Sequence, residues 1–420
     1  MGKISNEQLK RLVYNKILEL EKTKTFNFLS DNNNNNYIRF MANPIPKNSS
    51  SLLSNVDLNN WYNPTGFKGS KNTTKNPVIV IVDAYTTPNI KTDLKTYCDT
   101  FNIPLMNGLP NVNDIKLGNF SIYYQQTNTN TSYTATYGTT NNNMFVPNNS
   151  GWGLEINLDV QYAHTIAPYA DIVLVLAKSS SVADLTSAVK FGNSIPNVVS
   201  LSMSWGANEN TVFKTVDSMF NNANIIHTAA SGDSGSAGGI IWPSANPNVV
   251  SVGGTTITKS NTTYSETAWS GSGGGVSNIY NKPTYQSKIT LKKMRMNPDI
   301  SMLASPSVSV CDSFYAPVGG WVYNIGGTSL ASPLLAGLVA LAIQYKYPTG
   351  TWTNITKSKF MNVIYNLSNN KNYNNVVRDI IKGNNGGYNT LTSFDLVTGV
   401  GSPKPTVSNN VNGLLYALTY

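Results

Sequence analysis

The sequence predicts an α/β fold with a central, mostly parallel sheet that is covered by helices on both faces. Continuous runs of apolar, mostly β-branched residues recur along the chain, as expected for strands that are buried on both sides. Helical segments lie between several of these runs. Glycine-rich turns follow the carboxyl ends of the expected strands, where the functional residues of such sheets are usually located. The expected strands are residues 78–82, 171–177, 198–203, 224–229 and 249–252, and the expected helices are residues 90–101, 153–166, 182–191 and 211–223.

The composition is that of a chain with a sizeable core. Of its 420 residues 40% are hydrophobic and 12% are charged, and no apolar run is long enough to predict a membrane span. The net charge of +9 permits binding to nucleic acid, but the lysines are scattered and no nucleic-acid motif accompanies them. We therefore expect no nucleic-acid partner. The two cysteines do not make a disulfide framework, so we expect them to be buried thiols.

The N-terminal part differs from the rest. Residues 5–22 have helical apolar spacing with a capping pair, Ser5 and Gln8, whereas residues 31–54 are rich in Asn, Ser and Pro, as in a linker. The helix could pack on the main domain or on a partner. The sequence therefore predicts an extension over residues 1–54 and one domain over residues 55–420. The start of the chain shows no apolar segment typical of a signal peptide.

Ser329 is the first candidate catalytic residue. Two glycines and a threonine precede it, and the apolar run of residues 330–345 follows. This pattern places Ser329 in the first turn of a buried helix, where free N–H groups and the helix dipole favour a developing oxyanion. A serine in such a place is either a nucleophile or a simple helix cap.

Two carboxylates, Glu155 and Asp159, lie four residues apart and therefore share one face of the expected helix. They could form a solvated acidic face, but their apolar neighbours favour a buried pair that shares a proton. Such a pair can act as a general base with an orienting acid. Asp233 stands in a glycine-rich turn after an expected strand, and it could either cap backbone N–H groups or take part in catalysis.

Together these segments resemble the sedolisin family of serine-carboxyl peptidases, which have a subtilisin-like fold. The matching segments follow in the family's order at residues 56–63, 78–94, 155–168, 202–206, 231–235, 297–300 and 327–333. The resemblance implies Ser329 as nucleophile, Glu155 as general base, Asp159 as its orienting acid and protonated Asp233 as donor to the oxyanion. A carboxyl group donates only while it is protonated, so the resemblance also implies activity at acidic pH.

A histidine-dependent subtilisin is the main rival on the same fold. The chain has only His164 and His227, and both lie in apolar stretches without the glycine-threonine that resemblance to subtilisins requires. We expect both to line the core.

The resemblance also implies one calcium ion near the C-terminus. Its ligands would be the side chains of Asp379 and Asp395 and the carbonyls of Ile380, Leu391 and Ser393. Oxygen ligands suit a hard cation such as calcium. This sequence departs from the family pattern at Leu391 and Ser393, where glycine is usual, so the loop must reach the ligand geometry without the conformational freedom of glycine.

The expected function is hydrolysis of protein or peptide substrates by a monomer, as an endopeptidase or a tripeptidyl-peptidase. Family members are mostly secreted or lysosomal, and the sequence assigns no compartment. The prosegments of family members are usually much longer than 54 residues. The extension over residues 1–54 is therefore either a reduced prosegment that acts as an inhibitor or chaperone, or a segment of a protein that matures differently. The alternative is a catalytically silent binding or structural protein on the same fold; a weaker one is an esterase.

Overall fold

The computed structural model describes residues 39–40, 43–44, 55–62, 69–72, 74–129, 134–141, 145–305, 308–353, 355–365, 375–404 and 413–419. The chain divides into two units, Met1–Tyr37 and Ile38–Tyr420. The helix expected over residues 5–22 lies outside the described residues, and everything below concerns the second unit.

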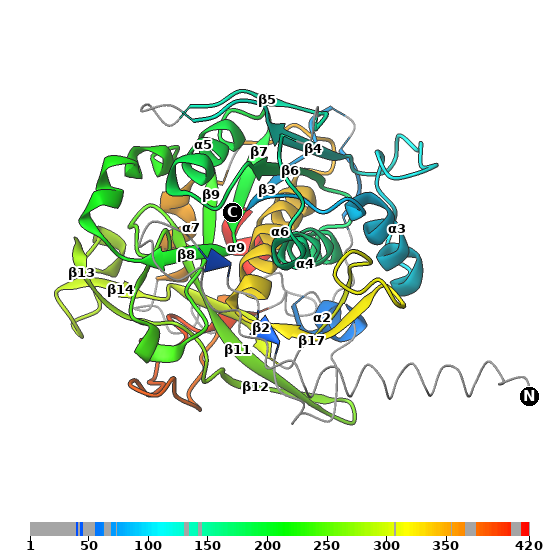
Figure 1. Cartoon of the computed structure of the whole chain (residues 1–420). Coiled ribbons are helices and arrows are strands. Elements are labelled where there is room, and N and C mark those ends of the chain that lie inside the picture. The colour runs from blue at the N-terminus through cyan, green and yellow to red at the C-terminus, as the bar shows by residue number, and fades with distance from the viewer. Residues whose placement is uncertain are drawn as a thin grey trace, which may run out of the picture. The chain divides into compact units, whose positions relative to one another are not determined.

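Among the described residues, nine strands form one sheet (Figure 1). In chain order they are β3 (Val78–Ala84), β4 (Phe120–Gln125), β5 (Tyr137–Gly138), β6 (Asp171–Ala177), β7 (Val198–Met203), β9 (Ile226–Ala230), β11 (Val250–Ser260), β12 (Thr263–Ala268) and β15 (Ile300–Ser305). Their order across the sheet is β12-β11-β9-β7-β3-β6-β4-β5, with β15 also beside β11. All pairs are parallel except β12 with β11 and β5 with β4, so the predicted parallel sheet is confirmed.

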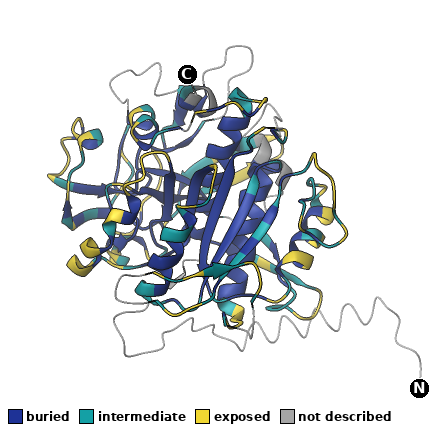
Figure 2. Cartoon of the chain, turned by 90° about the horizontal axis from the view of Figure 1, so that it is seen from above, coloured by how far each residue is buried: buried dark blue, intermediate teal, exposed yellow. Residues whose placement is uncertain are grey.

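Helices cover this sheet on both faces (Figure 1). Alternate residues of a strand point to opposite faces, so Ile79 and Ile81 of β3 join one buried cluster and Val80 joins another. The first cluster includes residues of α3 (Ile90–Phe101), α4 (Ser150–Ile166) and α6 (Thr328–Lys346), and the second includes residues of α5 (Val182–Gly192). The central strands are buried almost throughout, as Figure 2 shows in dark blue. These are the three layers that the sequence predicts.

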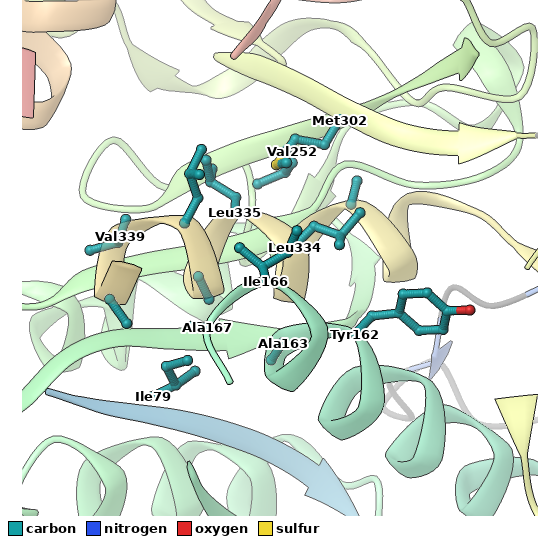
Figure 3. Packing of buried hydrophobic residues seen from close by; sticks show 14 of the residues in the cluster. Ile79, Tyr162, Ala163, Ile166, Ala167, Val252, Met302, Leu334, Leu335 and Val339 are labelled. Atoms are coloured by element: carbon teal, nitrogen blue, oxygen red, sulfur yellow. The ribbon is translucent and has the colours of Figure 1, made fainter. Parts of the chain in front are cut away.

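Helices α4 and α6 lie against each other at the centre of the larger cluster. Figure 3 shows Ala163 and Ile166 of α4 facing Leu334 of α6. A Cβ at Gly337 of α6 would lie 2.9 Å from the carbonyl oxygen of Ala163, so glycine permits this close approach. Helix α6 has the length and hydropathy of a membrane span, yet 94% of its most apolar window is buried inside the fold, as in a core helix.

The prediction of an α-helix over residues 211–223 is wrong. The structure has two short 3₁₀ turns there, η2 (Thr211–Thr215) and η3 (Asp217–Phe220). The segment contains β-branched and aromatic residues that disfavour an α-helix. Asp217 also accepts hydrogen bonds from Trp242 and from Tyr280, which fixes the chain in the tighter turns. The other three expected helices are confirmed, with α4 beginning earlier at Ser150 and α5 ending at Gly192.

The remaining elements surround the sheet. The helices are α2 (Asn55–Tyr62), α7 (Lys357–Ile364) and α9 (Leu414–Thr419), and two further 3₁₀ turns are η4 (Gly235–Gly238) and η5 (Thr284–Gln286). Small sheets contain β8 (Trp205–Asn208), β10 (Ile241–Trp242), β13 (Gly275–Asn281), β14 (Met294–Asn297), β16 (Val308–Cys311), β17 (Trp321–Gly326), β18 (Val377–Arg378) and β19 (Ser402–Pro403). Cys98 and Cys311 are buried free thiols, as expected.

Two short strands lie within the segment expected to be a linker. They are β1 (Arg39–Phe40), which pairs antiparallel with β8, and β2 (Asn43–Pro44), which pairs antiparallel with β17, as Figure 1 shows for β2. This part of the N-terminal segment therefore belongs to the backbone framework of the main unit.

Candidate active site

The candidate site lies at the carboxyl ends of β3 and β7, which are neighbours in the sheet. Ile81 of β3 is in register with Ser202 of β7, and two residues further along the chain come Asp83, near the end of β3, and Ser204, just after β7. The chain turns from β7 directly into β8 at Trp205, whose indole N–H donates to the carbonyl of Val82 at 2.7 Å. This bond ties the start of β8 to the end of β3.

Ser329 is the second residue of α6 and is fully buried. The residue before the helix, Gly327, has φ +114°, a conformation that glycine adopts without strain. It lets the chain turn from β17 into α6 within a single step. The predicted position of Ser329 in the first turn of a buried helix is thus observed.

A proline inside α6 shapes the surroundings of Ser329. Pro333 has no N–H, so it cannot donate the usual helical hydrogen bond to the carbonyl of Ser329, four residues earlier. The hydroxyl of Ser204 donates to that carbonyl instead, at 3.2 Å. In return, the Ser329 hydroxyl donates to the Ser204 carbonyl at 3.3 Å. The two serines are therefore bonded reciprocally.

Ser204 also links Ser329 to the acids on α4. Its hydroxyl oxygen also lies 2.8 Å from Asp159 Oδ1, so its single proton is shared between this oxygen and the Ser329 carbonyl, while Asp159 Oδ2 has no hydrogen-bond partner among the described residues. Glu155 and Asp159 are both fully buried, which excludes the alternative of a solvated acidic face. Burial raises the pKa of Asp159 well above its usual range, and the nearby carboxylates of Asp83 and Glu155 raise it further. The acids therefore favour a shared proton.

Asp83 is a third buried acid that the sequence did not single out. It lies in β3, and neither oxygen of its carboxyl has a hydrogen-bond partner among the described residues. Burial raises its pKa to about 8. Its charge acts on Asp159, so the three carboxyl groups form one electrostatic cluster. Asp83 lies in a segment that resembles the family, residues 78–94, but the resemblance assigned no role to this acid.

Asp233 lies beside the first turn of α6. Its Oδ1 accepts hydrogen bonds from the backbone N–H of Thr328 at 2.8 Å and from the Thr328 hydroxyl at 2.7 Å. The same hydroxyl accepts a bond of 3.1 Å from the N–H of Gly232. Asp233 is half-buried and is held next to Ser329 through Thr328. The structure thus brings all four predicted catalytic residues to one place, and their roles stay predictions.

Comparisons with known proteins identify the family and the fold. A family model described as the subtilase family matches residues 121–383. The chain belongs to the subtilase family. Its curated relatives include sedolisin of Pseudomonas sp. (strain 101), 31% identical over 50% of this chain and 40% of that protein. Kumamolisin of Bacillus sp. (strain MN-32) is 30% identical over 59% of this chain and 49% of that protein. The predicted sedolisin family is therefore confirmed.

The subtilisin-like fold is also confirmed. A solved structure of Pseudomonas sedolisin, complexed with two molecules of pseudo-iodotyrostatin, aligns with a TM-score of 0.65 at 24% identity. The alignment covers 84% of this chain and 96% of that one. The chain spans less than half the length of the curated relatives named above.

Within the described residues, the ring nitrogen Nε2 of each histidine of this subtilase bonds to a partner other than Ser329, and both histidines line the core as expected. His164 Nε2 donates to the carbonyl of Pro104 at 2.7 Å, and burial lowers its pKa to about 4. His227 Nε2 lies 2.8 Å from Asn193 Oδ1, and burial also lowers its pKa, with the charge of Lys357 adding to the effect. Both imidazoles are thus held neutral by partners away from α6.

The predicted calcium ligands lie around one loop. The N–H of Ser393 donates to both carboxylate oxygens of Asp379, at 3.1 and 3.0 Å, and the N–H of Leu391 donates to Asp395 Oδ2 at 3.2 Å. Asp395 is buried, and burial raises its pKa. Ser393 has φ +72°, the left-handed conformation that glycine would ease.

These residues fit a hard cation in the chemistry of their side chains, because two carboxylates converge on one loop. In the described part of the chain, no group of three or more Asp, Glu, His or Cys side chains is arranged to hold a metal ion. An ion here would therefore depend on the carbonyls of Ile380, Leu391 and Ser393, whose role as ligands stays a prediction.

Proposed function

We propose that this protein is a serine-carboxyl peptidase that hydrolyses peptide bonds through an acyl-enzyme on Ser329. The observation that carries the proposal is the hydrogen-bonded connection from Ser329 through Ser204 to Asp159. It joins the first turn of α6 to a buried pair of carboxyl groups on α4, and no histidine takes part in it. Membership of the subtilase family and the named relatives support the same activity.

The residues divide the chemistry among themselves. Glu155 takes the proton of the Ser329 hydroxyl as the hydroxyl oxygen attacks the peptide carbonyl carbon. Asp159 orients Glu155. The two carboxyl groups share a proton because they are close to each other and buried. Glu155 then returns its proton to the leaving amine, and water hydrolyses the acyl-enzyme by the same route.

Asp233 stabilises the tetrahedral oxyanion in this proposal. Its position next to Thr328 places a carboxyl group beside the start of α6, where the dipole already favours negative charge. The carboxyl must be protonated to donate a hydrogen bond, so the rate of turnover increases in acid. The substrates are proteins or peptides, and the protein acts as a monomer.

One calcium ion completes the proposal. Asp379 and Asp395 would hold it with the carbonyls of Ile380, Leu391 and Ser393. The ion would fix the C-terminal loop by neutralising two converging carboxylates. The chemistry at Ser329 does not involve it.

The proposal is tested with a denatured protein substrate from pH 3 to pH 7 in the presence of calcium. Wild type and Ser329→Ala are compared, and the products are identified by mass spectrometry. Cleavage that requires Ser329 and is fastest in acid supports the proposal, and the cut sites separate endopeptidase from tripeptidyl-peptidase action. Cleavage fastest at neutral pH would contradict the role of Asp233. The absence of cleavage by folded wild type at every pH would favour a silent binding protein.

A further inference from the structure

A second group of buried acids lies outside the candidate active site, where β16 packs beside α3 and α4. Asp312 directly follows β16 and is fully buried, and Asp93 belongs to the first turn of α3 and is 3% exposed. The N–H of Ser313 donates to Asp93 Oδ2 at 3.1 Å, which ties the chain after β16 to α3. Burial, with the charge of Asp93 adding to it, raises the pKa of Asp312 to about 6. The two carboxyl groups therefore lie close enough to act on each other.

The protein uses only one oxygen of the Asp312 carboxyl. Oδ1 accepts hydrogen bonds from the N–H groups of Phe314 and Tyr315, both at 3.0 Å. Oδ2 has no hydrogen-bond partner among the described residues, and neither has the hydroxyl of Thr87, which lies between β3 and α3 and is 2% exposed. Both atoms approach the same point of α4, since a Cβ built on Gly153 would lie 3.4 Å from Thr87 Oγ1 and 3.7 Å from Asp312 Oδ2. Two buried oxygens from different segments are thus directed to one place.

The charge of these acids is not balanced by the side chains around them. The ion pairs of the described residues involve other acids, so within that part of the chain neither Asp93 nor Asp312 is paired with a lysine, arginine or histidine. Buried charges in proteins are usually paired or bound to a metal ion, because an isolated charge in the interior is unfavourable. The place therefore calls for a cation that the chain itself does not supply.

We propose that Asp312, Asp93 and Thr87 form a second cation site, which binds one calcium ion. All three side chains offer oxygen, the ligand atom that hard cations prefer, and two carboxylates match a divalent charge. The ligands come from three separate segments, and calcium accepts such an irregular set more readily than magnesium, which requires near-octahedral geometry. The site supplies three protein ligands, fewer than the five predicted in the C-terminal loop, so calcium should bind here more weakly than there.

This site would act on the position of α4 without touching the reacting groups. Gly153 precedes Glu155 by two residues, which is about 200° around the helix, so the site lies on nearly the opposite face of α4 from the acids of the candidate active site. The bound ion would join α3, α4 and the chain after β16. It would thereby hold the helix that carries Glu155 and Asp159 against its neighbours, and the main effect of the ion should be on stability.

The test counts the calcium bound to the full chain at pH 7.5, by equilibrium dialysis against calcium in the millimolar range followed by atomic emission. Asp312→Asn keeps an oxygen for the N–H groups of Phe314 and Tyr315 but removes the charge and one ligand oxygen. This variant should bind one calcium ion fewer than wild type, whereas a change at an exposed acid, Asp114→Asn, should leave the count unchanged. An equal count in wild type and Asp312→Asn overturns the inference.

A variant of the C-terminal loop shows whether the two sites are separate. Asp379→Asn should lose the ion that binds at lower calcium concentration and keep the one that Asp312→Asn loses. If the C-terminal loop holds no ion, wild type should bind a single calcium ion, which Asp312→Asn still loses. Magnesium that occupies the Asp312 site as readily as calcium would contradict the choice of ion.

Thermal unfolding separates loss of the ion from loss of structure. With chelator, Asp312→Asn should melt no lower than wild type, because it removes a buried charge that has no cationic partner among the described residues. In millimolar calcium it should melt lower than wild type, which the ion stabilises. Thr87→Val removes a ligand hydroxyl at constant charge and should weaken the same binding step about tenfold or more. If Asp312→Asn melts lower than wild type by the same amount in both conditions, the role of Asp312 is only structural and the inference is wrong.

Discussion

The hydroxyl of Ser204 donates a 2.8 Å hydrogen bond to Asp159 and thereby connects the acids on α4 to the serine on α6. The connection depends on Pro333, which leaves the Ser329 carbonyl without its helical donor and so makes it available to Ser204. Three elements that are far apart in the sequence, α4, the β7–β8 turn and α6, are joined through one side chain. We therefore regard Ser204 as a positioning residue for the proposed reaction.

Replacement of Ser204 tests this role. Ser204→Ala should lower kcat by roughly tenfold to a hundredfold with little change in KM, because Asp159 loses its orienting donor. The matched control is Ser202→Ala, two residues earlier on β7, which removes a buried hydrogen bond to Ser332. Each variant should lose about 1 kcal/mol of unfolding free energy. If both variants lower kcat equally, the effect is general destabilisation and the positioning role is wrong.

Asp83 should control how stability depends on pH. Its pKa is raised from 3.8 to about 8 in the folded state, so the folded protein holds a proton that the unfolded chain releases. The contribution of this group to stability is complete below pH 3.8 and is lost as the pH rises through about 8. Between these values the free energy of unfolding should decrease by about 1.4 kcal/mol per pH unit for this one proton.

Asp83→Asn removes this titration, and chemical denaturation from pH 4 to pH 8 measures it. The variant should show a flatter dependence of unfolding free energy on pH than wild type. Asp99→Asn, a change at an exposed carboxylate paired with Lys95, serves as the control and should keep the slope of wild type. An unchanged slope in Asp83→Asn would show that the buried carboxyl is ionised in the folded protein.

Pro333→Ala separates helix stability from activity. An alanine N–H can bond the Ser329 carbonyl in the ordinary helical pattern, which should raise the unfolding free energy by up to about 3 kcal/mol. The same bond competes with Ser204 for that carbonyl, so kcat should decrease. A variant with a higher Tm and an undiminished kcat would show that the Ser204 bond to the carbonyl is unnecessary.

The calcium proposal predicts a stabilisation that depends on the ion and on Asp379. Calcium at about 100 times its Kd should raise the unfolding free energy by about 2.7 kcal/mol, and a chelator should reverse this. Asp379→Asn should lower the Tm measured with calcium to near that of wild type with chelator. The exposed Asp114→Asn should respond to calcium as wild type does. If wild type has the same Tm with calcium and with chelator, the site holds no stabilising ion.

The sequence predicted those parts of the fold whose own residues determine their structure. The apolar runs of β3, β6 and β7 are buried on both faces, so composition alone identified them. Strand β11 extends to Ser260, well beyond the expected residue 252, because the hairpin partner β12 supports its polar end. The two-residue strands β1 and β2 are supported by β8 and β17 and not by a pattern of their own, so a linker was expected there.

In the candidate site, too, some residues could be predicted from the sequence and others only from the folded structure. Ser329, Glu155, Asp159 and Asp233 stand in motifs with a recognisable family order, and the structure places them together. Asp83 and Ser204 also lie in matching segments, residues 78–94 and 202–206, but the resemblance assigned them no role, because their importance arises from the register of β3 with β7. Only the folded chain shows that a third acid and a linking hydroxyl lie beside the predicted residues.

The most direct test of the carboxyl mechanism is covalent labelling of Ser329 by a serine-directed fluorophosphonate, followed by peptide mapping in wild type and Glu155→Gln. Wild type should be labelled at Ser329, and Glu155→Gln should react at least a hundredfold more slowly while its melting temperature confirms a folded chain. Labelling of Ser329 at the same rate in both proteins, or a wild type that is not labelled at Ser329, would contradict the proposal that buried carboxyl groups activate this serine.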